Sequence, residues 1–315
     1  MIVARKDPLL IRVDYCKTSP ASAMSSLLQY LPLSLAVREA MRMRALAEFG
    51  ALETPVLDIG CGDGLFWEVV TRHYIDDKAY RLDGLLGVDI NTAELDLASV
   101  RLADTGVELK AIDISSNVQI HTLRELHGRF RTVIANCSLE HVPSLDQSLA
   151  NIRKLLKDRN SVFYLFVPAP DWTECFRVKQ FVRRFSPRLA GVYGALFDGF
   201  FQHHHLYPPY VWKHLLEGNG FSDVEIVGLG SKASNRLFER WLLPAFASFA
   251  VKSVVNHYPS LFQGIKAKYV LREARFLQEM HDGTLIHTDL HAADIVEYFI
   301  RCQMGPATSN GSAAG

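Results

Sequence analysis

The sequence has no excess charge of either sign. Its 315 residues include 34 Lys and Arg against 34 Asp and Glu, so the formal net charge is zero. Proteins bind nucleic acid largely by neutralising phosphates, and a chain without a positive field is poorly suited to that task. We therefore expect neither DNA nor RNA as a partner.

Long apolar runs and paired cysteines are also missing. The longest strongly apolar run, Trp241 to Val251, contains Pro244 and is far shorter than the about 20 residues of a bilayer-spanning helix. No transmembrane segment is expected. The five cysteines form no Cys-x-x-Cys pair, which favours a reducing compartment. The N-terminus lacks an apolar segment of signal-peptide length, so the sequence predicts a cytoplasmic protein.

A dense glycine turn is the main feature that the sequence does contain. Val56–Ile59 is typical of a buried strand, and Gly60, Gly62 and Gly64 separate it from a helix that begins at Leu65. Glycines there let a ligand approach the backbone closely. The spacing is not the Gly-x-Gly-x-x-Gly of dinucleotide-binding folds, and no Gly-Lys-Ser/Thr follows. The pattern therefore disfavours a phosphate-bearing nucleotide.

Strands and helices alternate after this turn. Apolar runs predict strands at 55–59, 85–89, 107–112, 132–136 and 161–167. Alternation of this kind predicts a parallel, doubly wound sheet whose ligands bind at the carboxyl ends of the strands. Asp58, Asp89 and Asp113 all fall at or near that edge.

Two motifs resemble those of class I S-adenosylmethionine (SAM)-dependent methyltransferases. Val-Leu-Asp-Ile-Gly-Cys-Gly-Asp-Gly, from Val56 to Gly64, resembles the family's first motif, and Asn136 to Val142 resembles its fourth. The resemblance covers roughly 55–230. It implies a Rossmann-like, doubly wound, seven-stranded, mostly parallel sheet with helices on both faces, together with a helical insertion near the C-terminus.

The resemblance also implies a set of cofactor-binding residues. Asp89 would accept hydrogen bonds from the ribose hydroxyls, and Asp113 with Ile114 would hold the adenine; the alternatives are a helix-capping role for Asp89 and a turn role for Asp113. The full set is Asp58, Gly60, Cys61, Gly62, Gly64, Asp89, Ile90, Asp113, Ile114, Asn136 and Cys137.

The chain divides into five predicted parts. These are an N-terminal helical segment over the cofactor site (1–50), the SAM-binding core (51–230), a helical insertion or lid (231–292), the final strand (293–302) and a disordered tail (303–315). The aromatic-rich insertion has two interpretations: a helical cap packed on the core, or a lid that makes peripheral membrane contact through 236–262. The stretch that follows Pro168 is rich in aromatics and arginines, and we assign it no helix or strand.

Histidines are the candidate catalytic bases. In an extended segment alternate residues share a face, so His203 and His205 would both face the pocket while His204 would not. His141 is a third candidate, in the fourth motif. The alternative is that these histidines are structural. No further ligand lies at metal-binding spacing, and we predict no metal.

The sequence therefore predicts a methyltransferase that transfers a methyl group from SAM, by in-line displacement, to a small-molecule, lipid or glycan-intermediate acceptor, most readily at oxygen. No Asn-Pro-Pro-Tyr-like sequence follows the fourth strand, which argues against methylation of exocyclic amines. Two alternatives remain: a non-catalytic SAM-binding sensor or assembly subunit, and an NAD(P)-dependent reductase, which the glycine spacing disfavours.

Overall fold

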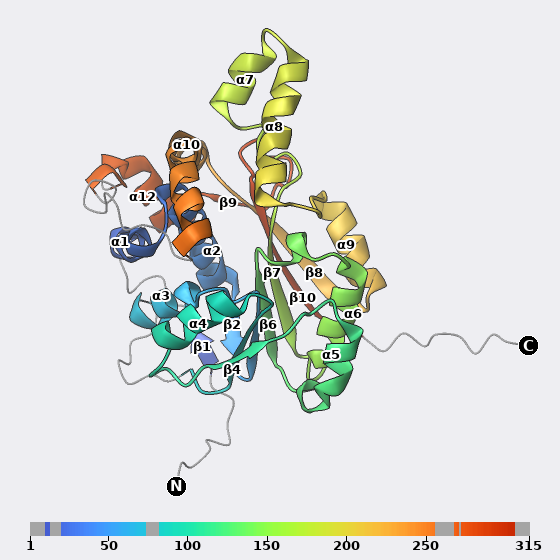
Figure 1. Ribbon diagram of the computed structural model, residues 1–315. Coiled ribbons are helices and arrows are strands. Elements are labelled where there is room, and N and C mark those ends of the chain that lie inside the picture. The colour runs from blue at the N-terminus through green and yellow to red at the C-terminus, as the bar shows by residue number, and fades with distance from the viewer. Residues whose placement is uncertain (1–9, 13–19, 74–81, 256–267, 271, 306–315) are drawn as a thin grey trace, which may run out of the picture.

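A central sheet organises the molecule (Figure 1). The computed structural model describes residues 10–12, 20–73, 82–255, 268–270 and 272–305. The strands of the central sheet are β3 (Val56–Ile59), β4 (Leu85–Asp89), β5 (Glu108–Ala111), β6 (Thr132–Asn136), β7 (Val162–Pro168), β8 (Phe221–Leu229), β9 (Ile286–His287) and β10 (Glu297–Met304). Their order is β5-β4-β3-β6-β7-β10-β8-β9.

The predicted doubly wound α/β topology is confirmed. The strands β3 to β7 are parallel, and β10 inserts antiparallel between β7 and β8. The sheet has eight strands rather than the predicted seven. The additional strand, β9, has two residues and pairs at the edge, with Gly228 opposite His287. A strand that short leaves no periodicity by which the sequence could reveal it.

Helices cover both faces of the sheet, as expected (Figure 1). One side carries α1 (Pro20–Tyr30), α2 (Leu33–Phe49), α3 (Leu65–His73), α10 (Lys232–Val255) and α12 (Ala274–Asp282). The other side carries α5 (Asn117–Thr122), α6 (Leu145–Leu155) and α9 (Pro209–Gly218). Helix α4 (Thr92–Arg101) packs beside α3.

The core lies where the strands β7 and β10 pair. The rings of Phe166 and Phe299 stack with centroids 4.7 Å apart, and Tyr164 stacks on Phe299 at 5.7 Å. Burial of such aromatic side chains supplies much of the free energy that holds a sheet and its helices together. The buried strands β3, β4 and β6 belong to the same sheet, so their carboxyl ends lie at one edge of this core.

Segments outside the central sheet differ from the predictions in three ways. The predicted helical segment 1–50 also contains strand β1 (Leu10–Arg12), which pairs with β2 (Ala51–Glu53). The stretch after β7, to which no element was assigned, forms α7 (Arg177–Arg183) and α8 (Pro187–Phe201). The final strand runs on to Met304, inside the predicted tail, while 306–315 lie outside the described residues.

The predicted helical insertion at 231–292 contains α10, α12 and the short strand β9. Helix α10 packs against α2, and Leu237, Phe238 and Leu242 are buried. The predicted membrane contact through 236–262 falls partly on 256–267, outside the described residues. Within the described part of the chain, none of the helices combines the length and apolar character that a bilayer crossing requires.

Candidate active site

The glycine turn after β3 is open to a ligand. Gly60, Gly62 and Gly64 all have positive φ, at 74°, 53° and 75°. A Cβ on Gly60 would lie 2.4 Å from Cβ of Ser138, whereas one on Gly62 would meet nothing within 4 Å. Glycine is needed at these positions because other residues rarely adopt positive φ. The turn is tightly packed at its base and unobstructed at Gly62.

Asp89 lies beside the turn, and its contact with a ribose stays a prediction. Its Oδ2 accepts a hydrogen bond from the backbone N–H of Gly62 at 3.0 Å, and its Oδ1 accepts one from the N–H of Asn91 at 2.9 Å. The helix-capping role belongs instead to Asn91, whose side chain accepts from the N–H of Ala93. Next to Asp89, the side chain of Ile90 is 75% exposed, so an apolar surface is available beside the carboxylate.

The Asp113 carboxylate is held in place by its own turn. Its Oδ1 accepts hydrogen bonds from the N–H and the hydroxyl of Ser115, at 2.8 and 2.6 Å. Ile114 is buried, and its carbonyl accepts a hydrogen bond from Asn151. Both the turn role and the ligand role are compatible with this geometry, and the ligand role stays a prediction.

Asp58 is buried and hydrogen-bonded to Trp67. Its carboxylate is 3% exposed and accepts a 2.7 Å hydrogen bond from the indole N–H of Trp67. Burial raises the pKa of Asp58 to about 7. Any effect of Asp58 on a ligand would be indirect in this arrangement, through the position of β3 and α3. Cys61, the other buried side chain of the predicted set in this turn, has its pKa raised by burial.

The carboxyl end of β6 brings Asn136 and Cys137 to the same edge. Asn136 donates to Oε1 of Glu39 at 2.9 Å, while its own Oδ1 is buried without a hydrogen-bond partner. Cys137 has a positive φ of 50°, which is uncommon for a residue other than glycine. An unpaired buried acceptor beside a strained residue is a feature often found at binding sites.

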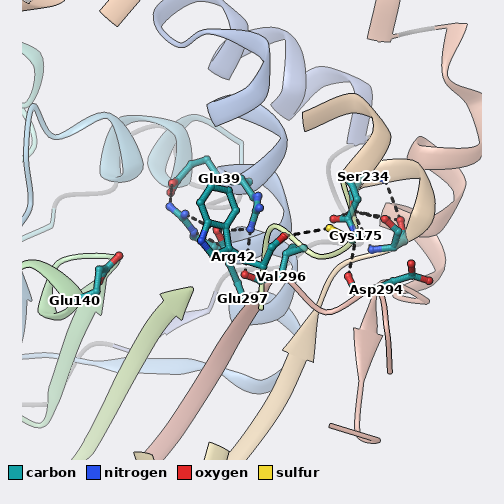
Figure 2. Close-up of polar contacts among 12 residues, drawn as sticks. Glu39, Arg42, Glu140, Cys175, Ser234, Asp294, Val296 and Glu297 are labelled. Atoms are coloured by element: carbon teal, nitrogen blue, oxygen red, sulfur yellow. Dashed lines mark hydrogen bonds and ion pairs between the residues drawn. The ribbon is translucent and has the colours of Figure 1, made fainter. Parts of the chain in front are cut away.

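A buried ion cluster closes this edge of the sheet (Figure 2). Oε1 of Glu297 accepts from Arg38 at 3.0 Å and from Arg42 at 2.8 Å. Arg42 also donates to Oε2 of Glu39 at 3.0 Å. Burial alone would raise the pKa of Glu297, but the positive charges of Arg42 and Arg38 outweigh it and hold that pKa below its usual value. Arg38, Arg42 and Glu297 were not among the predicted site residues.

A cavity of about 710 Å³ runs from the glycine-turn edge past this cluster. That volume lies within the usual range of small-molecule sites. Its lining residues are Leu35, Arg38, Arg42, Asn91, Cys137, Glu140, His141, Pro168, Trp172, Phe200, Phe201, Gln202, His203, Phe238, Lys252 and Glu297. The wall is thus aromatic on the side of α8 and α10, and polar on the side of α2 and of the loop after β6.

The structure separates the histidines that were grouped as candidate bases. His141 and His203 both line the cavity, and their rings stack with centroids 5.6 Å apart. His205 lies outside the cavity lining: its Nε2 is 2.8 Å from the carbonyl of Val142, and its Nδ1 is 3.1 Å from the Tyr207 hydroxyl. The expected sharing of a face by His203 and His205 is therefore not seen, because both ring nitrogens of His205 are engaged elsewhere.

Glu140 was not among the predicted site residues. It is 1% exposed, lines the cavity, and its Oε2 has no hydrogen-bond partner. Figure 2 shows its carboxylate standing apart from the Arg42 and Glu297 cluster. Burial raises the pKa of Glu140, although the nearby His141 and His203 oppose the shift. The Leu-Glu-His sequence of the fourth motif was the signal that could have indicated it.

Comparison with known proteins identifies the family. A family profile described as a methyltransferase domain matches residues 26–226. The chain belongs to the SAM-dependent methyltransferases. The glycine turn, the parallel sheet and the cavity at its carboxyl edge agree with that family.

Several relatives match part of this methyltransferase. The ubiquinone biosynthesis O-methyltransferase of Pseudomonas aeruginosa is 31% identical over 108 residues, which cover 34% of this chain and 42% of that protein. The highly reducing polyketide synthase 2 of Gibberella zeae is 25% identical over 201 residues, which cover 59% of this chain and 7% of that protein. The chain therefore spans less than half the length of these curated relatives.

Solved structures also resemble the methyltransferase. The Haemonchus contortus phosphoethanolamine N-methyltransferase 2 in complex with SAM is 16% identical, with a TM-score of 0.45 over 83% of this chain and 51% of that one. The geranyl diphosphate C-methyltransferase of Streptomyces coelicolor is 15% identical, with a TM-score of 0.45 over 80% and 72% of the two chains.

The residues at the glycine-turn edge fit the SAM cofactor. Gly62 leaves room for a ligand, Asp89 presents a carboxylate beside it, and Ile90 presents an exposed apolar surface. The buried Oδ1 of Asn136 offers an acceptor without a partner in the protein, which suits the positively charged amino group of an amino-acid moiety. The individual contacts stay predictions.

Proposed function

We propose that this methyltransferase methylates an oxygen of a small-molecule or lipid-like acceptor that binds in the 710 Å³ cavity. One observation carries the proposal. The cavity connects Asn91 and Cys137, at the cofactor edge, with the buried Glu140 and its neighbours His141 and His203. A hydroxyl acceptor needs a base, and these are the side chains that can provide one.

The proposed division of roles follows from position. Asp89, the glycine turn and Asn136 would hold the cofactor, which, when bound, supplies a methyl group on a positively charged sulfur. Trp172 and Phe238 form an apolar wall that would orient the acceptor and exclude water, and such orientation is worth up to about 7–11 kcal/mol. The name of one reported relative supports oxygen as the acceptor atom, since it is a ubiquinone biosynthesis O-methyltransferase.

Glu140 would take the proton from the acceptor hydroxyl. Glu140 lines the cavity, its Oε2 has no hydrogen-bond partner, and Nε2 of His141 lies 3.7 Å from its Oε1. A buried carboxylate with a raised pKa is a stronger base than an exposed one. His141 would stabilise the charge on Glu140 or relay the proton to solvent, because its own side chain is 41% exposed.

The proposal is tested by binding and turnover. We would titrate S-adenosylhomocysteine by calorimetry into the wild type, Asp89→Ala and the control Asp96→Ala, whose side chain is exposed on α4. Acceptor classes would then be screened by release of S-adenosylhomocysteine. We expect Asp89→Ala to weaken binding by about 10–100-fold, because hydrogen bonds to a charged group are lost, and Asp96→Ala to bind normally.

Other outcomes would favour the alternatives. Undiminished binding by Asp89→Ala would refute the pocket assignment. Tight binding with no turnover on any hydroxyl, amine or carbon acceptor would favour a sensor or assembly subunit. Binding of NAD(H) in preference to S-adenosylhomocysteine would favour a reductase.

A further inference from the structure

Exposed apolar side chains are concentrated on one helical hairpin. Of the thirteen exposed large hydrophobic residues in the described part of the chain, seven lie in α7, α8 and the turn between them. They are Val178, Phe181, Phe185, Leu189, Val192, Leu196 and Phe200. Phe185, in the turn, is 77% exposed. Apolar patches of this kind mark interaction sites on soluble proteins.

The exposed residues of α8 form a continuous stripe. Leu189, Val192, Leu196 and Phe200 recur at intervals of three and four along the helix, so they share one face. The opposite face carries the buried Ala190, Gly194 and Phe197. Helix α8 is therefore not amphipathic. Both of its faces carry apolar side chains, and the rest of the protein covers only one of them.

The hairpin is well anchored at its base, so its exposure does not reflect poor packing. The indole of Trp172 donates to Asp198 at 2.7 Å and packs edge-on against Phe197. The carboxylate of Glu239, on α10, accepts from the first two backbone N–H groups of α7, both at 2.8 Å. Figure 1 shows that the two helices extend beyond the rest of the fold.

Positive charge accompanies the stripe. Between 174 and 202 there are five basic residues against two acidic ones, in a chain whose net charge is zero. Arg177, Arg183, Arg184 and Arg188 are exposed. Arg183 forms an ion pair with Glu174, whereas neither Arg184 nor Arg188 has an acidic partner among the described residues. Exposed apolar side chains flanked by arginines match an anionic bilayer surface, since arginine reaches headgroups while the apolar groups insert.

The stripe leads to the cavity. Phe200, its last member, is 41% exposed and also lines the cavity. Its ring packs on Phe246 of α10 with centroids 4.5 Å apart. A molecule that left a bilayer at the hairpin would therefore pass along apolar side chains to the aromatic wall of the site.

We propose that the α7–α8 hairpin docks on an anionic phospholipid bilayer and presents the cavity to acceptors dissolved in it. The docking itself is independent of the proposed function, whereas the supply of an acceptor from the bilayer rests on it. The apolar stripe would insert at the level of the headgroups, and Arg184 and Arg188 would contact lipid phosphates. The hairpin, and not α10, would make the membrane contact.

Vesicle cosedimentation of the whole protein tests the proposal. Vesicles of phosphatidylcholine alone would be compared with vesicles that also contain phosphatidylglycerol. We expect binding to the anionic vesicles, reduced at least about tenfold in Phe185→Asp/Leu189→Asp and in Arg184→Glu/Arg188→Glu. Two matched controls should bind like the wild type: Val100→Asp/Val118→Asp, which alters exposed valines on α4 and α5, and Lys157→Glu/Arg159→Glu, which reverses exposed charges elsewhere.

Three results would overturn the proposal. In the first, the wild type binds neither kind of vesicle. In the second, the hairpin variants and the control variants lose vesicle binding equally. In the third, sedimentation velocity shows a wild-type dimer that Phe185→Asp/Leu189→Asp dissociates, and no vesicle binding is seen. The last result would identify the stripe as a contact between two copies. S-adenosylhomocysteine titration of the same samples separates the two proposals, because it reports on the cofactor site and not on the hairpin.

Discussion

The guanidinium of Arg42 donates two hydrogen bonds to the carboxylate of Glu297, from Nε to Oε2 at 3.0 Å and from Nη2 to Oε1 at 2.8 Å. The first residue lies on α2 and the second begins β10, so the contact joins segments that are 255 residues apart. Bidentate geometry of this kind fixes orientation as well as charge. It holds the N-terminal helix against the carboxyl edge of the sheet, where the cavity lies.

Glu297→Gln should therefore be strongly destabilising. The substitution leaves two buried arginines, Arg38 and Arg42, without their shared countercharge, and loss of one partner of a buried pair costs about 3–5 kcal/mol in the free energy of unfolding. Urea denaturation measures the change. The control is Glu225→Gln, which removes an exposed ion pair with Arg301 from the same sheet and should cost less than about 1 kcal/mol. Equal effects of the two substitutions would contradict the role given to the buried cluster.

Gly60→Ala should disrupt the turn. The new methyl group would lie 2.4 Å from Cβ of Ser138 at a φ of 74°, and the combined clash and backbone strain should cost about 2–5 kcal/mol. Gly191→Ala is the matched control, because that glycine lies within α8 and its new methyl group would meet nothing within 4 Å. It should stabilise the protein by about 0.5–1 kcal/mol. Thermal denaturation of both variants checks the sign of each change.

Glu140→Gln should separate binding from turnover. The amide keeps the shape of the side chain but cannot accept a proton, so kcat should fall by about 10²–10⁴-fold while the affinity for S-adenosylhomocysteine stays unchanged. In the wild type the rate should rise with pH through the raised pKa of Glu140, because the base acts when deprotonated. The variant should lose that rise. The control is Glu125→Gln, whose side chain is exposed, and a wild-type pH profile in Glu140→Gln would exclude Glu140 as the base.

Asp58→Asn should change the pH dependence of stability. Burial raises the folded-state pKa of Asp58 from its ordinary value of 3.8 to about 7, so the folded protein holds this proton more tightly than the unfolded chain. Stability from this group is fully present below about pH 4 and is lost as the pH rises towards 7, by up to about 4 kcal/mol. Asparagine keeps an acceptor for Trp67 and does not ionise.

The free energy of unfolding of Asp58→Asn should therefore rise relative to the wild type between about pH 4 and pH 7, which are close to the ordinary and the folded-state pKa of Asp58. Urea denaturation at several pH values measures the difference. If the difference in free energy of unfolding between Asp58→Asn and the wild type does not depend on pH, the pKa of Asp58 is the same in the folded and the unfolded state, which would contradict the prediction.

The sequence alone determined the parallel sheet, the cofactor and the position of the glycine turn at the carboxyl edge. Local patterns suffice there, because a buried parallel strand is a short apolar run, a tight turn needs glycine, and an acid after a strand falls at a known edge. The predicted strands at 55–59, 85–89 and 132–136 match β3, β4 and β6 to within a residue. Asp89 lies beside the turn as expected.

Only the tertiary structure decided which polar side chains share the cavity. Arg38, Arg42 and Glu297 come from opposite ends of the chain, and no local pattern links them. The histidines at 203 and 205 diverge because His205 finds partners in Val142 and Tyr207. Helix α8 was missed for a related reason: it is apolar on both faces, and a periodic sequence signal needs one polar face. Which apolar face is covered depends on what packs against it, and that is a property of the fold.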